Sequence, residues 1–333
     1  MKKRLIAYLG SGDFTESDAK MLTLVNIAFG AIDPDGTIHA EHRHNENIAK
    51  YKSWNPDLKF VLSLVQTKSN SFTSVCANKD YMNRMGEEAV RVVKTLGYDG
   101  IDLDWEYPCV PSNGQDTCRE DKYRFTELIK TLREHLDAAG KYLLTIAAGA
   151  DLYYAECTEL DKLSIYLDYI NVMTYHLKCG FHSLAGHHTQ LFSSTGDVFM
   201  NSCDQALRLF HSYGVPKDKL LLGAAMYSRK AEGLKDRNHG FLQIASKPVG
   251  YGPDYSILVK DYINKNGFVR YWDDEAKAPW LFNGSTFISY DDPESMRCKA
   301  QYVLDNDFGG VFYWEHKCDD TRTLLGALYD VLK

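Results

Sequence analysis

Acidic and hydrophobic residues alternate over positions 102–106, so the two-residue period of a β-strand would direct Asp102, Asp104 and Glu106 to one side. Alternate side chains on a strand lie about 6.6 Å apart, which is close enough for each negative charge to oppose ionisation of the next. One carboxyl can therefore keep its proton near neutral pH. Glu106 comes last, at the carboxyl end of the strand, where a parallel barrel opens to solvent and catalytic groups usually lie. It is our candidate general acid.

Two other interpretations of this segment are weaker. A solvated acidic strand face is disfavoured because Ile101, Leu103 and Trp105 indicate that the opposite face is buried against another layer. A calcium loop would need a glycine at its sixth position and would not carry large hydrophobic residues between its ligands.

The bulk properties are those of a globular protein that could hold one large α/β domain or two smaller ones: 333 residues, 44% hydrophobic and 25% charged. A formal charge of -7 offers no basic field for nucleic acid or anionic lipid, and no apolar run approaches the roughly 20 residues that cross a bilayer. We therefore expect an uncharged ligand, no nucleic-acid partner and no membrane partner. Aromatic residues make up 13% of the chain, which suits sugar binding but equally suits core packing.

The basic start Met1-Lys2-Lys3 imitates a signal peptide, but the apolar stretch after it is too short, so we interpret it as the first strand. The cysteines show no metal-type pairs. Cys109 and Cys118 could close one short loop in an oxidising compartment; otherwise the set is eight ordinary thiols.

Eight apolar runs bounded by turn signals alternate with helical stretches, and this pattern predicts a (β/α)₈ TIM barrel that spans residues 1–333 as one catalytic domain. The runs are 4–9, 22–32, 60–65, 100–105, 142–148, 169–174, 219–225 and 309–314. The predicted helices are 80–96, 122–139, 158–166, 201–213 and 293–305.

The spacing breaks at residues 230–290, which predicts a small α+β or β insertion after the seventh strand. Loops after strands form the active-site rim of such barrels, so Trp272 and Trp280 could line a groove. A small hydrophobic cluster beneath the insertion explains them equally well.

The acidic segment resembles the signature D-x-x-D-x-D-x-E of glycoside hydrolase family 18, the chitinase family, complete here as Asp99, Asp102, Asp104 and Glu106. Further segments resemble the family's motifs in family order on the predicted strands. They are 26–29 (NIAF, including Phe29), 169–175 (YINVMTY, including Met173 and Tyr175), 222–229 (LGAAMYSR) and 309–314 (GGVFYW).

The resemblance implies a retaining glycosidase that cleaves β-1,4-linked N-acetylglucosamine by substrate-assisted catalysis, an exception to the two-carboxylate scheme. Glu106 would protonate the leaving oxygen and then act as base, Asp104 would orient the acetamido N–H, Asp102 would share a proton with Asp104, and Tyr175 would donate to the acetamido oxygen. We further predict that the substrate is bound by Tyr8, Phe29, Met173, His176, Tyr227, Arg229 and Trp314, with Trp314 as the floor. Asp99, of opposite strand parity, should support the turn.

Two departures from the family concern specificity. His176 stands where the family usually has Asp or Asn, and a histidine titrating near pH 6.5 would set part of the acid limb of activity. Residues 63–67 (SLVQT) lack the two glycines and the tryptophan of the family's third strand, which predicts weak binding on the leaving-group side. His182, His187 and His188 could reach that side, although we favour a solvated loop.

Several alternatives remain open at this stage. Endo-β-N-acetylglucosaminidase activity on N-glycan chitobiose cores, a non-hydrolytic chitin-binding lectin, and an inhibitor-type barrel whose groove the insertion blocks would all use the same barrel. The chemistry needs no metal and no organic cofactor. We expect a monomer whose partner is an N-acetylglucosamine-containing oligo- or polysaccharide. A polymeric sugar suggests export, although no leader is visible in this sequence.

Overall fold

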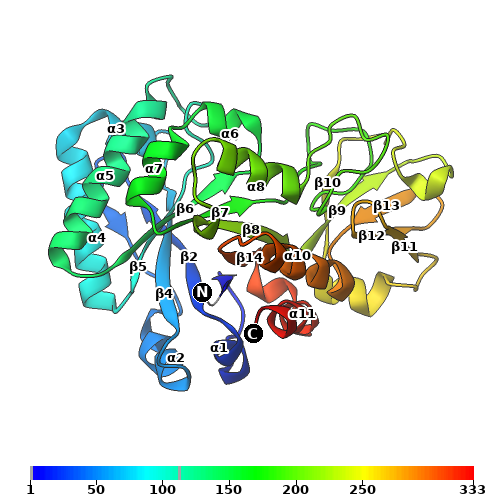
Figure 1. Cartoon of the computed structure of the whole chain (residues 1–333), viewed down its shortest axis with the longest axis horizontal. Coiled ribbons are helices and arrows are strands. Elements are labelled where there is room, and N and C mark those ends of the chain that lie inside the picture. The colour runs from blue at the N-terminus through cyan, green and yellow to red at the C-terminus, as the bar shows by residue number, and fades with distance from the viewer. Residues whose placement is uncertain (1–2, 112–113) are drawn as a thin grey trace.

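The computed structural model describes residues 3–111 and 114–333, and its centre is a closed barrel of parallel strands. Met1 and Lys2, which belong to the basic start considered above, lie outside the described residues. Figure 1 shows helices around the barrel and a separate small sheet beside it. The predicted (β/α)₈ fold is confirmed.

The barrel strands follow the order β1-β14-β8-β7-β6-β5-β4-β2, and pairing of β1 with β2 closes the ring. Their bounds are β1 Arg4–Leu9, β2 Leu24–Ile32, β4 Lys59–Gln66, β5 Gly100–Asp104, β6 Leu143–Gly149, β7 Tyr169–Met173, β8 Leu220–Ala225 and β14 Gly310–Trp314. Each of the eight predicted runs coincides with one of these strands to within two residues at either end, because strands buried on both faces are nearly continuous in apolar residues. β3 (Ile38–His39) pairs antiparallel with β2 at its end.

The helices pack on the outside of the barrel. Their bounds are α1 Glu16–Met21, α2 Ile48–Trp54, α3 Ser71–Ala77, α4 Lys79–Leu96, α5 Asp121–Ala139, α6 Leu152–Glu156, α7 Leu160–Tyr166, α8 Cys203–Ser212, α9 Tyr255–Ile257, α10 Pro293–Asp305 and α11 Thr323–Leu332. The five predicted helices correspond to α4, α5, α7, α8 and α10.

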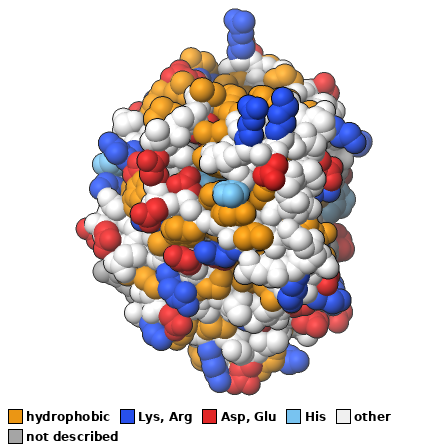
Figure 2. All heavy atoms as spheres, turned by 90° about the vertical axis from the view of Figure 1, so that its right-hand side faces the viewer, with side chains coloured by type: hydrophobic (Ala, Val, Ile, Leu, Met, Phe, Trp, Pro, Cys, Tyr) orange, Lys and Arg blue, Asp and Glu red, His pale blue; other side chains and the backbone are white. Residues whose placement is uncertain are grey.

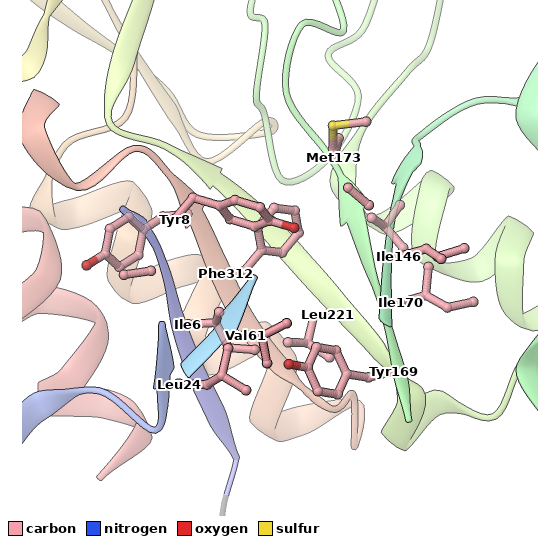
Figure 3. Close-up of a cluster of buried hydrophobic side chains, with 14 of the residues drawn as sticks. Ile6, Tyr8, Leu24, Val61, Ile146, Tyr169, Ile170, Met173, Leu221 and Phe312 are labelled. Atoms are coloured by element: carbon pink, nitrogen blue, oxygen red, sulfur yellow. The ribbon is translucent and has the colours of Figure 1, made fainter. Parts of the chain in front are cut away.

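Residues with inward parity fill the barrel. Figure 3 shows such side chains from several strands, among them Ile6, Leu24, Val61, Tyr169 and Leu221. The opposite faces pack against helices: the Trp105 ring, 1% exposed, stacks on Phe72 of α3 at 5.1 Å and meets Phe125 of α5 edge-on at 5.3 Å. These contacts confirm that the hydrophobic face of the acidic segment is buried, and they fix the direction in which the acids point.

The insertion is a five-stranded antiparallel sheet in the order β10-β9-β13-β12-β11. Its bounds are β9 Tyr227–Glu232, β10 Gly250–Asp254, β11 Val269–Asp273, β12 Ala278–Phe282 and β13 Thr286–Ser289. The sheet thus begins at Tyr227, earlier than the predicted start at 230. In Figure 2, which faces this end of the molecule, Lys, Arg, Asp and Glu side chains are intermixed over the surface.

Trp280 belongs to the hydrophobic cluster of the insertion and does not line a groove. Its ring lies 5.3 Å from that of Tyr271 and 6.1 Å from that of Phe287, and its Nε1–H donates to the His239 carbonyl at 3.0 Å. Trp272 is partly exposed, with the Arg270 guanidinium 5.3 Å from its ring centre. The cluster interpretation is therefore the correct one for Trp280.

The cysteines are free thiols, so the loop-closing pair of Cys109 with Cys118 is not formed. The Cys118 Sγ lies 3.1 Å from an Asp121 carboxylate oxygen, while the Cys109 Sγ lies 3.7 Å from the Cys157 carbonyl. Asp99 accepts the Phe60 N–H at 2.8 Å at the amino end of β5, which agrees with its predicted supporting role.

Candidate active site

The three acids lie in file at the carboxyl end of β5, as the strand period predicts. Asp102 is fully buried, while Asp104 and Glu106 are each partly exposed. The depth of burial therefore decreases from inside the barrel toward its mouth, and Glu106 is the outermost of the three.

Asp102 is held by donors from four other strands. Its Oδ2 accepts from Tyr8 Oη at 2.9 Å and Ser63 Oγ at 2.7 Å, and its Oδ1 accepts from Thr145 Oγ1 at 2.6 Å and Asn171 Nδ2 at 3.4 Å. Burial nevertheless raises the pKa of Asp102, because desolvation outweighs these hydrogen bonds. Asp102 is thus a fixed, sealed acid beneath Asp104.

Asp104 differs from Asp102 in its hydrogen-bond partners. Its Oδ1 is sealed from solvent and has no hydrogen-bond partner among the described residues. Burial, followed by the charges of Glu106 and Asp102, raises the pKa of Asp104 well above its ordinary value. Burial also raises the pKa of Glu106, and a hydrogen bond with Tyr107 offsets part of this effect. The pair can therefore retain a proton in a pH range where isolated carboxyls have lost theirs.

Tyr175 stands beside these acids and is buried, with 7% of its surface exposed. Burial, and then the charges of Asp104 and Glu106, raise its pKa well above the ordinary value. The hydroxyl therefore remains a proton donor in the working pH range. Its ring meets those of Tyr227 and Phe312 edge-on at 6.1 and 6.0 Å.

Aromatic rings from β2 and β14 form a flat surface. The Phe29 and Trp314 rings stack at 5.4 Å with 21° between their planes, and Tyr8 lies 5.8 Å from Trp314. Met173 ends β7 and is 8% exposed, above Ile146 and Ile170 in Figure 3. A partly exposed stacked pair of this kind can hold the apolar face of a sugar.

The remaining predicted binding residues form one cluster with Tyr251 of β10. The His176 ring lies 5.2 Å from Tyr227 and 5.8 Å from Tyr251, and the Arg229 guanidinium lies 3.7 Å from the Tyr251 ring centre. The Tyr227 hydroxyl and Arg229 Nε are buried without hydrogen-bond partners in the described part of the chain. Tyr251 is a member of this cluster that the sequence did not reveal.

The predicted titration of His176 near pH 6.5 is wrong. Burial, followed by the positive charge of Arg229, lowers the pKa of His176 to about 3. The ring is therefore neutral through the pH range in which the acid limb was expected, and it cannot repel the proton of Glu106.

The favoured solvated-loop interpretation of the later histidines is also wrong for two of them. His187 is 1% and His188 is 0% exposed. His187 packs against Phe241 at 5.0 Å and Trp280 at 5.7 Å, while His188 lies 5.3 Å from Tyr227. The insertion covers this loop, which is why polar composition alone misled the prediction. His182 is partly exposed and packs edge-on against Phe199 at 4.5 Å.

Sequence reasoning missed the donors Ser63, Thr145 and Asn171, which hold Asp102. Their signal was available, since each is a polar residue within an apolar strand run. It also missed Tyr107, which hydrogen-bonds to Glu106, and Tyr153. Tyr153 comes from a helix too short to produce a periodic pattern.

Across residues 3–111 and 114–333, no cluster of three or more His, Cys, Asp or Glu side chains could hold a metal ion. None of the helices in this same part of the chain has the length and apolar composition needed to span a bilayer.

Comparison with known proteins identifies a family that matches this chain. The model of the family "Glycosyl hydrolases family 18" matches residues 4–319. This chain belongs to that family. The match covers every barrel strand and all four positions of the acidic signature.

The chain is 38% identical over 301 residues to chitinase A1 of Niallia circulans, covering 84% of this chain but 43% of that protein. It is 28% identical over 330 residues to chitotriosidase-1 of Mus musculus, covering 92% of this chain and 68% of that protein. The chain thus spans less than half of the first of these relatives.

A solved structure matches end to end. It is a family 18 N-acetylglucosaminidase from Paenibacillus barengoltzii, 42% identical, with a TM-score of 0.95 and 99% of both chains covered. A group IV chitinase of Ostrinia furnacalis, solved with allosamidin, is 26% identical with a TM-score of 0.86, and the match covers 99% of this chain and 98% of that one.

Proposed function

We propose that this protein is a retaining glycoside hydrolase that cleaves β-1,4 linkages after N-acetylglucosamine, with Glu106 as general acid and base. The observation that carries the proposal is Glu106 at the barrel mouth, above an Asp104 whose Oδ1 has no partner among the described residues. Family membership and the relatives described as chitinases support the substrate class.

The first step forms an oxazolinium ion from the substrate itself. The acetamido oxygen of the sugar attacks its own anomeric carbon, while Glu106 transfers its proton to the leaving oxygen and the glycosidic bond breaks. Asp104, whose Oδ1 has no partner among the described residues, turns a carboxylate oxygen toward the acetamido N–H, accepts from it and orients the group. The Tyr175 hydroxyl, protonated because of its raised pKa, donates to the acetamido oxygen.

The second step returns the enzyme to its starting state. Glu106, now ionised, takes a proton from water, whose oxygen attacks the anomeric carbon and opens the oxazolinium ring. Two displacements at one carbon retain the anomeric configuration. Asp102, fixed by Tyr8, Ser63, Thr145 and Asn171, supports Asp104 from below and shares a proton with it. Trp314 and Phe29 form the floor under the reacting sugar.

Glu106→Gln tests the catalytic assignment because it removes the transferable proton while keeping the shape of the side chain. We expect hydrolysis of chitotetraose to fall by at least about 100-fold, the contribution typical of a general acid, with oligosaccharide binding preserved in calorimetry. Hydrolysis by the variant at the wild-type rate would end this assignment. A wild-type protein that binds chitotetraose without cutting it would instead be the lectin considered above.

The length of the product distinguishes exo from endo action. The end-to-end similarity to a protein described as an N-acetylglucosaminidase favours a second candidate, the release of single N-acetylglucosamine residues. Product analysis on chitooligosaccharides of two to six sugars separates monomer release from dimer release. A high-mannose glycopeptide in the same panel detects the endo-β-N-acetylglucosaminidase activity.

A further inference from the structure

Tyr153, on α6, has one end anchored in the protein and the other exposed. The residue as a whole is 39% exposed. Its hydroxyl packs against Gly149 at the end of β6, where a Cβ atom would come within 2.4 Å of the hydroxyl oxygen. Any larger residue at position 149 would displace the ring, so the glycine permits this close approach.

A chain of contacts joins Tyr153 to the catalytic acid. The rings of Tyr153 and Tyr107 meet edge-on at 5.2 Å, and the two hydroxyls are close enough for each to shift the pKa of the other. Tyr107 in turn hydrogen-bonds to Glu106. Only the Tyr107 side chain thus separates Tyr153 from Glu106, whose proton the leaving oxygen receives.

The barrel order places Tyr153 on the leaving-group side. In the closed ring β14 lies opposite β5, with β8, β7 and β6 between them on one side. A sugar that rests on Trp314 of β14 and has its glycosidic oxygen at Glu106 directs the leaving group outward, past the end of β5 and of its neighbours β4 and β6. Tyr153 follows β6 directly and is the exposed ring at this edge.

Exposed apolar residues lie beside Tyr153 in the sequence and on a loop that is tied to the start of α6. Leu152 is 51%, Phe199 is 42% and Met200 is 59% exposed. A hydrogen bond of 3.3 Å from Asn201 Nδ2 to Asp151 Oδ2 ties the loop that bears Phe199 and Met200 to the start of α6. Exposed apolar surface that lies beside a catalytic group commonly marks a ligand groove.

The end of β4 contributes no ring to this edge. Ser63 Oγ donates to Asp102, and Thr67 Oγ1 donates to the Ile32 carbonyl at 3.0 Å. An aromatic contact with a leaving sugar must therefore come from another element, and α6 provides one.

We infer that Tyr153 determines specificity on the leaving-group side: its exposed ring stacks on the first sugar of the leaving group while its hydroxyl stays anchored beside Glu106 through Tyr107. The occupant is a neutral pyranose, whose apolar face suits an aromatic ring. This inference rests on the proposed hydrolase function and adds the residue that binds the acceptor sugar.

The test compares two substrates with the same donor sugar. In chitotetraose the leaving group contains at least one sugar, whereas in the corresponding β-glycosyl fluoride it is a single atom. Tyr153→Ala should raise KM for chitotetraose about tenfold, the factor that 1.4 kcal/mol produces, with kcat within twofold. Its kcat/KM on the fluoride should stay within twofold of wild type, because no ring contact is lost there.

Two variants serve as controls. Tyr153→Phe keeps the ring and should restore the wild-type KM, which separates stacking from a role of the hydroxyl. Tyr123→Ala, on α5 and 59% exposed, removes a tyrosine elsewhere and should match wild type on both substrates. Thermal melts establish that each variant is folded.

Equal losses on both substrates, or an unchanged KM for chitotetraose in Tyr153→Ala, would overturn the inference and leave the hydrolase proposal standing. A wild-type protein that cleaves neither substrate would contradict the proposed function itself, and the inference with it.

Discussion

Asp104 and Asp18 both have carboxyl oxygens sealed inside the protein, but their surroundings differ. Asp18 accepts from Arg322 Nε at 2.8 Å and from the Thr15 N–H at 2.9 Å, and His316 Nε2 lies 3.2 Å away. Burial acts to raise the pKa of Asp18, but the hydrogen bond and charge of His316, together with Thr15 and Arg322, hold it well below the usual range. Among the described residues Asp104 has no such partner at Oδ1, and its pKa is raised.

A structural acid and a reactive acid differ in the hydrogen-bond partners that surround them. A structural carboxylate is surrounded by hydrogen-bond donors and stays ionised. Asp18 is an example, since its contacts join α1 to the segment before α11. A carboxyl group used in chemistry keeps an oxygen without a hydrogen-bond partner, although this lowers the stability of the folded protein.

Asp18→Ala should cost the most stability, about 3–5 kcal/mol in urea unfolding, because it leaves Arg322 and His316 without their carboxylate. Turnover per folded molecule should not change. Since the pKa of Asp18 is depressed in the folded state, its contribution is present above the unfolded pKa and is lost as pH falls. The deficit should therefore shrink toward pH 3.

Asp35→Ala is the matched control, since its ion pair with Arg84 is 43–47% exposed and should contribute less than about 1 kcal/mol. Equal losses in the two variants would contradict the structural role of Asp18.

Asp104→Asn should lower kcat/KM by about 100-fold or more while stabilising the protein by about 1 kcal/mol, because it removes a carboxyl that the fold disfavours in its ionised form. The folded pKa is raised, so the folded protein retains protons that the unfolded chain releases. Stability of the wild type therefore falls as pH rises through this interval, and the gain from Asn should grow with pH. Thermal melts from pH 4 to pH 8 measure it.

Asp99→Asn, in the same signature, should behave in the reverse way. It accepts the Phe60 N–H and pairs with Lys52 at 2.8 Å, far from the barrel mouth. We expect lower stability with activity retained; a gain in stability here would remove the contrast with Asp104.

Ser63→Ala removes one of the donors to Asp102 and should cost about 1 kcal/mol in urea unfolding. Activity should fall less than tenfold because three donors remain. Ser53→Ala, which loses an exposed hydrogen bond to the Lys50 carbonyl, should be near neutral. A loss for Ser63→Ala as large as that for Asp104→Asn would mean that Ser63 does more than hold Asp102.

His176→Asn should have the smallest effect on the pH profile. With a pKa of about 3, the His176 ring stays neutral down to the acid limb of activity, so the limb should keep its midpoint in the variant. A shift of the midpoint by one pH unit in the kcat/KM profile would show that His176 titrates in the working range after all.

The sequence predicted the barrel because its strands are buried on both faces and appear as continuous apolar runs, from Arg4–Leu9 to Gly310–Trp314. It could not predict α6, because five residues do not complete two helical turns. α11 was missed since its sequence, TLLGALYDVL, is apolar on most sides.

In the site, strand parity was enough to align Asp102, Asp104 and Glu106. His176 is neutral because of burial and of the charge of Arg229, which lies on β9 of the insertion sheet. His187 and His188 are buried beneath the same insertion. These are contacts between segments far apart in the chain, and no local pattern encodes them.

The central claim is that Asp104 and Glu106, at the barrel mouth, keep their protons at pH values at which the structural acid Asp18 is ionised. Carbon-13 NMR of labelled carboxyl groups, titrated from pH 2 to pH 9, measures this directly, with Asp104→Asn, Glu106→Gln and Asp18→Asn assigning the signals. We predict that Asp104 and Glu106 titrate above their ordinary values of 3.8 and 4.5, while Asp18 stays ionised below 3.8. Ionisation of all three carboxyls together near pH 4 would contradict the account.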